Sequence, residues 1–188
     1  MGRFNIVPQD AFNSLELEAG ILLSNFNPRT PNIQDYEIIC ATTGGVNVSC
    51  VPIYADQCED IEYCVNIKEF QKLIGWECKL TTTCIRFTVD TIERALSAYT
   101  LSSPTGYKII TPRATLNLSD YKTAIWWVGD RADGGLVAVE LRNALSMSGA
   151  VIQTAKKSKG RMTFEFKGFS PLASPTDAPI RFYIADPK

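Results

Sequence analysis

Carboxylates and thiols are the side chains of this chain that could take part in catalysis or metal binding, because the 188-residue sequence contains no histidine. Histidine is the usual general base near neutral pH and the commonest metal ligand. Its absence removes the Ser-His-Asp, Cys-His and His-metal arrangements together. A carboxylate-based hydrolase using Asp130, Asp133 and Glu140 remains as an alternative. We expect no catalytic site and no enzyme activity, because acid–base chemistry without histidine needs paired or perturbed groups.

An acidic cluster lies in a long connection between apolar segments, at residues 55–74. Its carboxylates are Asp56, Glu59, Asp60 and Glu62. Their spacing lacks the pattern of a calcium-binding EF-hand and its closing glutamate, which favours a solvated acidic loop over a calcium site. We therefore expect no metal and no cofactor.

All six cysteines fall in the first half of the chain, at Cys40, Cys50, Cys58, Cys64, Cys78 and Cys84. No pair has the C-x-x-C spacing of a zinc site, and no histidine is present to complete a mixed site. The N-terminus lacks a secretory pattern, so we expect a reducing compartment that disfavours disulfides. Structural thiols are the favoured interpretation, with a metal site and disulfides as the alternatives. Cys78 and Cys84 should face the same side of one strand.

Composition indicates one globular domain over residues 1–188, with 45% hydrophobic and 21% charged residues. A net charge of −1 argues against a protein that binds nucleic acid mainly through the phosphate groups of the nucleic acid. A basic run from Lys156 to Arg161 is better explained as a hairpin tip than as a nucleic-acid patch. No apolar run approaches the roughly 18 residues of a membrane span, so we expect no membrane partner.

The first half of the chain predicts an arm, a hairpin and a loop. Residues 1–14 have no clear period, and their Phe4, Ile6 and Phe12 have no local apolar partner. Residues 36–54 predict a hairpin that turns at Thr42–Gly45. The connection 55–74 includes a short expected helix at 67–74, where apolar residues recur at helical spacing.

The second half predicts one good helix and then a succession of strands. A capping pattern begins at Asp90, and Pro104 ends the element. In Arg161–Phe169, alternation places Met162, Phe164 and Phe166 on one face. Trp126 and Trp127 are adjacent and must point to opposite faces of their strand. One indole therefore lies on the face away from the core, which predicts a second buried interface there.

Taken in order, these segments resemble the major tail proteins, or tail tube proteins, of long-tailed bacteriophages infecting Firmicutes and related gut bacteria. The similar segments are Ala19–Leu22, Ala41–Gly45, Glu59–Ile61, Thr111–Arg113, Trp126–Asp130, Asn143–Ser146, Phe164–Gly168 and Pro179. Together they span nearly the whole chain. The cysteine content departs from such proteins, which have no general need for thiols, but it does not affect the expected fold.

The resemblance implies a mainly-β fold, a β-sandwich or barrel of the tail tube type, with one flanking helix and an extended loop. Its subunits would form hexameric rings stacked into a tube that conducts double-stranded DNA without specific binding. The implied partners are further copies of the chain and the tape measure, tail terminator and distal tail proteins. The implied location is the virion tail, with the host cytoplasm during assembly.

Within such a tube, particular residues are expected at the interfaces and in the bore. Those expected between subunits or rings are Phe4, Ile6, Phe12, Asp56, Glu59, Asp60, Trp126 and Trp127. Glu140 and Glu165 are expected to face the lumen, because sixfold repetition of inward carboxylates would repel DNA phosphates. Cross-strand salt bridges with Arg142 and Lys167 are the alternative for these two glutamates.

Other functions remain open. A contractile-tail or type VI secretion tube protein would share the fold and add a sheath-binding outer face. A β-sandwich binding module, monomeric and with a concave aromatic patch, is a separate class.

Overall fold

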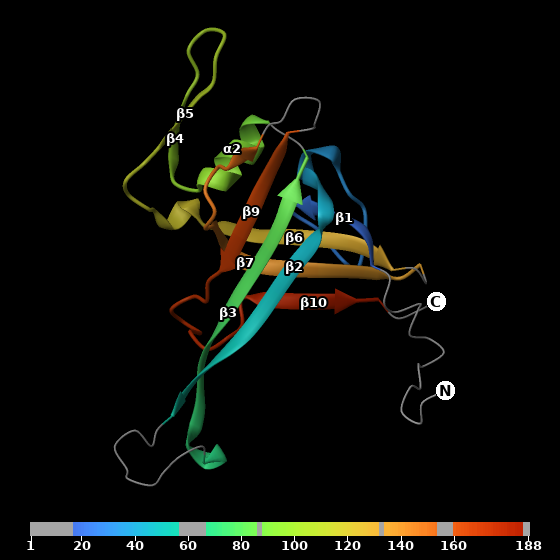
Figure 1. The fold of residues 1–188 in the computed structure, drawn as a ribbon, viewed down its shortest axis with the longest axis vertical. Coiled ribbons are helices and arrows are strands. Elements are labelled where there is room, and N and C mark those ends of the chain that lie inside the picture. The colour runs from blue at the N-terminus through green and yellow to red at the C-terminus, as the bar shows by residue number, and fades with distance from the viewer. Residues whose placement is uncertain (1–16, 57–66, 86–87, 132–133, 154–159, 186–188) are drawn as a thin grey trace.

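The computed structural model describes residues 17–56, 67–85, 88–131, 134–153 and 160–185, and most of these residues are in strands (Figure 1). The first strands are β1 (Leu17–Leu23), β2 (Ile38–Asp56) and β3 (Gln71–Cys84). Helix α2 (Val89–Leu96) follows, then β4 (Tyr99–Ser102) and β5 (Ile109–Pro112). The chain continues through β6 (Lys122–Arg131), β7 (Leu136–Ser146), β8 (Ile152–Gln153), β9 (Arg161–Gly168) and β10 (Ile180–Ile184). Short 3-10 turns occupy Asp35–Glu37, Lys68–Phe70 and Leu118–Asp120.

The main sheet closes on itself. Its order is β10-β7-β6-β1-β2-β3-β9-β8, and a further pairing joins the end of β7 to β9. Strands β1, β6, β7 and β10 form what we call the first wall, and β2, β3, β9 and β8 form the second. In Figure 1 the second wall crosses steeply in front of β6, β7 and β10. The predicted mainly-β sandwich or barrel with one flanking helix is confirmed for the described residues.

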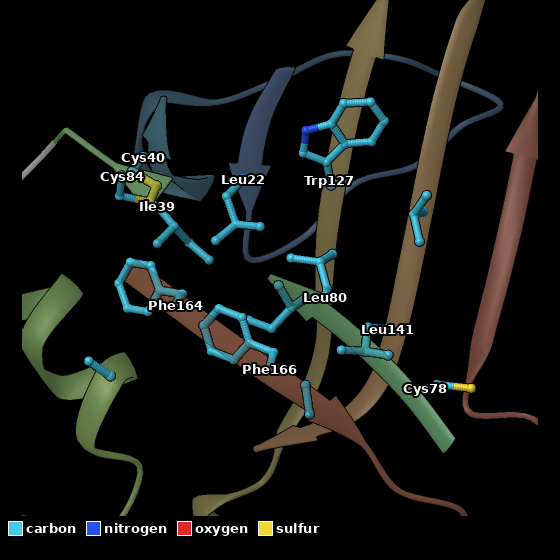
Figure 2. Close-up of a cluster of buried hydrophobic side chains, with 14 of the residues drawn as sticks. Leu22, Ile39, Cys40, Cys78, Leu80, Cys84, Trp127, Leu141, Phe164 and Phe166 are labelled. Atoms are coloured by element: carbon cyan, nitrogen blue, oxygen red, sulfur yellow. A yellow bond between two sulfur atoms is a disulfide. The ribbon is translucent and has the colours of Figure 1, made fainter. Parts of the chain in front are cut away.

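The core lies between the two walls (Figure 2). The second wall supplies Leu80 from β3 with Phe164 and Phe166 from β9, whose rings stack at 5.3 Å. The first wall supplies Leu22 and Trp127, both buried. Burying each such side chain stabilises the fold by about 1.5–3 kcal/mol. The predicted alternation in β9 is confirmed, since Met162, Phe164 and Phe166 are all buried.

A second apolar cluster covers the opposite side of the first wall. Trp126 lies there, with its ring edge-on to Phe26 at 5.8 Å and 5.4 Å from the ring of Tyr183. Glu37 fixes the segment that carries Phe26, because its carboxylate accepts hydrogen bonds from Asn25 Nδ2 at 2.8 Å and from the backbone N–H of Gln34 at 3.0 Å. The opposed orientation of the two tryptophans is confirmed.

This arrangement contradicts the expected subunit contact through Trp126 and Trp127. The two residues are 6% and 4% exposed within the single chain. The second buried interface is therefore internal, because residues 24–37 fold back over the outer face of β6. An indole buried in this way has no surface to offer a neighbouring subunit.

The predicted hairpin at 36–54 is wrong, because Ile38–Asp56 is one continuous strand. Gly44 and Gly45 have φ of +74° and +83°, and the register of β2 against β3 shifts between Thr43 and Val46. Two residues with positive φ can form either a tight turn or a bulge. The pairing of β2 with β3 on both sides of the glycines makes this a bulge.

The expected helix at 67–74 is also wrong. Only Lys68–Phe70 forms a short 3-10 turn, and β3 begins at Gln71. Residues 71–75 pair with Ile53–Asp56, so the ladder to β2 replaces the local helical hydrogen bonds. The connection expected over 55–74 is consequently shorter, since strand residues occupy both of its ends. Residues 57–66 and the expected arm 1–14 lie outside the described part of the chain.

The expected helix is confirmed, but its bounds differ from the prediction. Its N-cap is Thr88 and not Asp90, and it ends at Leu96, well before Pro104. The Thr88 hydroxyl accepts a hydrogen bond from the Thr91 backbone N–H at 3.3 Å, and Thr91 Oγ1 accepts one from the Thr88 N–H at 2.8 Å. This reciprocal cap satisfies two donors at the helix start. Ala95 joins the core and Ile92 packs against it, so the helix covers one end of the barrel.

The cysteines depart from the expected free thiols. Cys40 in β2 and Cys84 in β3 form a disulfide, with their Cα atoms 5.8 Å apart. Cys50 and Cys78 are free. Cys78, Leu80, Thr82 and Cys84 are all buried, which confirms the shared face predicted for Cys78 and Cys84. Cys58 and Cys64 lie outside the described residues.

Candidate functional site

The distal part of the β2–β3 hairpin is the candidate functional surface. Pairing between β3 and β9 stops at Cys78, whereas pairing between β2 and β3 continues as far as Asp56 and Gln71. Residues 51–56 and 71–77 therefore form a two-stranded ribbon, which Figure 1 shows extending away from the walls. An isolated two-stranded hairpin is only marginally stable in water. We call this segment the ribbon.

Apolar side chains of the ribbon face solvent. The large exposed ones are Val51 (52%), Ile53 (43%), Tyr54 (59%) and Ile74 (48%). Val51 and Ile53 are two residues apart on β2 and share one face, whereas Tyr54 points from the other. Both faces of the ribbon thus expose apolar surface that the described chain leaves uncovered. The sequence does not reveal this surface, because residues 67–74 also fit helical spacing and β3 begins there only through its pairing with β2.

Among the predicted contact residues, only Asp56 lies on the ribbon and within the described chain. It ends β2, and its Oδ2 accepts a hydrogen bond from Gln71 Nε2 at 3.0 Å. Phe4, Ile6, Phe12, Glu59 and Asp60 lie outside the described residues, so their expected contacts stay predictions.

The outward face of the second wall is polar and carries a charge cluster. Glu77 Oε1 lies 3.0 Å from Lys79 Nζ and 3.3 Å from Lys167 Nζ. The hydrogen bond from Lys79, followed by the one from Lys167, lowers the pKa of the Glu77 carboxyl. The hydrogen bond and the charge of Glu77 raise the pKa of Lys79. Glu165 projects from the same face, opposite Thr81, and its charge adds to this shift.

Glu140 projects from the other wall. Its neighbours Val139 and Leu141 point into the core, so the carboxylate lies on the outer face of β7. It accepts a hydrogen bond from Tyr183 Oη at 2.9 Å and lies 3.9 Å from Arg181 Nη1. The two glutamates expected to share the lumen therefore project from opposite walls. A bore lined by one wall would contain only one of them.

The carboxylates considered for hydrolysis are not arranged as a close pair. Asp130 pairs with Leu136, and Glu140 lies four residues further along β7. At about 3.3 Å per residue, this separates the two positions by roughly 13 Å along the strand. Paired carboxylates of glycoside hydrolases are about 5–9.5 Å apart. Asp133 lies outside the described residues.

A groove of about 470 Å³ lies among the loops around β7 and β9. Tyr121 and Phe169 line it with their rings edge-to-face at 5.4 Å. Leu118 and Leu172 flank these rings and are almost fully exposed. The groove is largely apolar, and among the described residues that line it the polar side chains are those of Tyr121, Asn143 and Ser170.

Neither a metal centre nor a membrane span is found in the described part of the chain. No group of three or more Cys, Asp or Glu side chains there is placed to hold a metal ion. No described helix is long and apolar enough to cross a membrane.

Comparison with known proteins gives no identification. No protein-family model matches the sequence, and no curated protein matches it significantly.

Proposed function

We propose that the protein is a structural subunit of a bacteriophage tail tube, which forms stacked hexameric rings around a channel for DNA. The order of sequence segments resembling major tail proteins supports this proposal. The mainly-β barrel with one flanking helix is compatible with it. The observation that carries most weight is the ribbon, because it needs a partner that the described chain does not supply.

The physical argument starts from the stability of the ribbon. Two strands joined only to each other gain little from burial, and Val51, Ile53 and Tyr54 remain in water. Packing against further copies of the chain would remove this apolar surface from solvent at about 25 cal/mol for each Å². Repetition of the same contact around a closed ring would cover the ribbon in every subunit.

A second surface that calls for a neighbour is the edge of the first wall. Strand β10 pairs with β7 on one side and ends the sheet order on the other. Phe182 and Ile184 are paired with Val139 and Val137, on the core side of the sheet, yet they are 54% and 65% exposed. An exposed apolar edge strand is a template for pairing with another chain. Ring closure would cover this edge without leaving an open end.

The outward face of the second wall is the better candidate for the bore. Its cluster of Glu77, Lys79, Lys167 and Glu165 mixes both signs, so any field in the bore would be weaker than the strongly negative one expected from the sequence. Such a surface still fits a conduit, since it offers DNA no continuous basic track.

The test is assembly of the purified protein, observed by negative-stain electron microscopy and light scattering. Wild-type protein should form rings or tubes, and the double variant Val51→Asp/Ile53→Asp should remain folded but fail to assemble. Leu172→Asp is the control, because it places a charge on an exposed apolar side chain that is not part of the ribbon. A wild-type protein that stays monomeric at high concentration, or tubes of normal length from the double variant, would overturn the proposal.

A binding module is the second candidate, and the groove at Tyr121 and Phe169 favours it. Exposed aromatic and leucine side chains around a concavity of about 470 Å³ could hold a small apolar ligand or chain segment. This function predicts a monomer in solution. Assembly that is lost with Val51→Asp/Ile53→Asp and unaffected by Leu172→Asp would favour the tube subunit instead.

A further inference from the structure

Cys50 and Cys78 form a thiol pair at the base of the ribbon. The two residues are direct register partners between β2 and β3, and their Sγ atoms are 3.4 Å apart. Direct partners in antiparallel strands have Cα atoms about 4.5–5.5 Å apart, within the roughly 4.4–6.8 Å spanned by disulfides. The strands would need no large movement to join the two sulfur atoms.

The two thiols differ in their access to solvent. Cys78 is fully buried on the core side of β3, whereas Cys50 is half-buried. Burial, followed by the hydrogen bond with Cys50, raises the pKa of the Cys78 thiol to about 12. The Cys78 thiol therefore stays protonated at neutral pH and is a poor first nucleophile. A reagent from solvent meets Cys50 first.

We propose that Cys50 and Cys78 are a site of reversible oxidation, at which a low-molecular-weight disulfide converts the thiol pair into a second cross-strand disulfide. In the first step Cys50 Sγ, as thiolate, attacks one sulfur of the small disulfide, which forms a mixed disulfide and releases one small thiol. In the second step Cys78 Sγ loses its proton to solvent, attacks Cys50 Sγ and releases the second small thiol. The protein thiols lose two electrons and two protons, and the small disulfide gains them as two thiols.

The position of this bond gives it a mechanical consequence. Pairing of β3 with β9 begins at Cys78, and the neighbouring β2–β3 pair on the side away from the walls, Val51 and Glu77, already belongs to the ribbon. A bond there would tie together the two strands of the ribbon where they leave the walls. The existing Cys40–Cys84 disulfide joins the same strands near the other end of the core, so the two bonds would clamp the hairpin at both ends of its buried part (Figure 2).

The experiment treats the full-length protein with oxidised glutathione, blocks remaining thiols by alkylation, and maps disulfides by peptide mass spectrometry without reduction. We expect a linked peptide containing Cys50 and Cys78 in most of the protein, and its loss after a reductant is added. Hydrogen exchange in residues 51–56 and 71–77 should slow at least severalfold in the oxidised protein. Alkylation of both residues in the treated protein, or a link from Cys50 to Cys58 or Cys64 instead, would overturn the proposal.

Single variants test the order of the two steps. Cys78→Ala should accumulate glutathione on Cys50, because the resolving thiol is missing. Cys50→Ala should leave Cys78 unmodified in the folded protein, because its thiol is buried. Equal glutathione incorporation in both variants would refute the assigned entry through Cys50. Circular dichroism of each variant shows whether it folds, and the wild-type cross-link tests the proposal independently of the variants.

Discussion

The Trp127 indole lies across two facing glycines, and filling either glycine should disrupt the core. Gly20 in β1 and Gly129 in β6 are register partners. A Cβ built on Gly20 would overlap Trp127 Nε1 and would lie 2.5 Å from Cε2, and one on Gly129 would lie 2.7 Å from Cη2. Carbon atoms in good contact are about 3.5–4.0 Å apart. The indole would therefore have to move by about 1 Å in either alanine variant.

The magnitude follows from the surroundings of the indole. Trp127 belongs to the core cluster with Leu22, Val139 and Leu141, so movement in one direction compresses other buried side chains. Overpacking a filled core costs about 1–3 kcal/mol. We expect Gly20→Ala, which makes the closest contact, to lower the free energy of unfolding by about 3 kcal/mol.

The assay is urea unfolding followed by circular dichroism, with Gly75→Ala as the matched control. Gly75 also lies within a strand, but a Cβ there meets nothing within 4 Å. That control should be neutral or stabilising by up to about 1 kcal/mol, because glycine is the more flexible residue in the unfolded chain.

A double-mutant cycle identifies the clash as the cause. Trp127→Phe removes the part of the ring nearest to Gly20, so Gly20→Ala should cost clearly less in that background than in the wild type. The reasoning is refuted if Gly20→Ala is as stable as Gly75→Ala, or if its cost is unchanged when Trp127 is replaced.

Three further predictions concern the disulfide, a buried ion pair and the Cys78 thiol. Because Cys40 and Cys84 close a loop of 44 residues, Cys40→Ser should lower the free energy of unfolding by about 2–5 kcal/mol. A reductant should lower the stability of the wild type and leave the stability of the variant unchanged. Asp120 is bound by Arg113 at 2.6 Å and accepts the Asn117 backbone N–H at 2.7 Å, so Asp120→Asn should cost about 1.5–3 kcal/mol in urea unfolding; a loss below about 0.5 kcal/mol would contradict the pairing. The pKa of Cys78 rises from 9.0 to about 12 on folding, so between these pH values the folded state keeps a proton that the unfolded state releases. The free energy of unfolding should therefore fall as pH rises from about 9 towards 12. In the same titration the free energy of unfolding of Cys78→Ala should fall less steeply.

Local patterns in the sequence predicted the elements whose hydrogen bonds or alternation are set by near neighbours. The apolar spacing through Ala95 predicted α2, although the sequence pattern placed the cap at Asp90 and the structure places it two residues earlier, at Thr88. Alternation in β9 places Phe164 and Phe166 in the core, because successive side chains of a strand point to opposite faces. The same rule put Trp126 and Trp127 on opposite sides of β6.

Tertiary structure decided the features for which two local solutions were available. Gly44 and Gly45 can form a turn or a bulge, and only the pairing of β2 with β3 on both sides selects the bulge. Residues 71–74 fit a helix by spacing, but β2 satisfies their backbone as a strand. The candidate site depends on this second choice, because the ribbon exists only where β3 continues beyond β9.

The thiols show the same division. Sequence spacing gave no pairing for Cys40 and Cys84, since disulfide formation depends on the distance between Cβ atoms and not on separation along the chain. Strand register brings these two residues together, and it also places Cys50 opposite Cys78. The sequence by itself determined which residues are apolar and how they alternate. The closure of the sheet determined which of them meet, because register is a property of two strands and cannot be read from one.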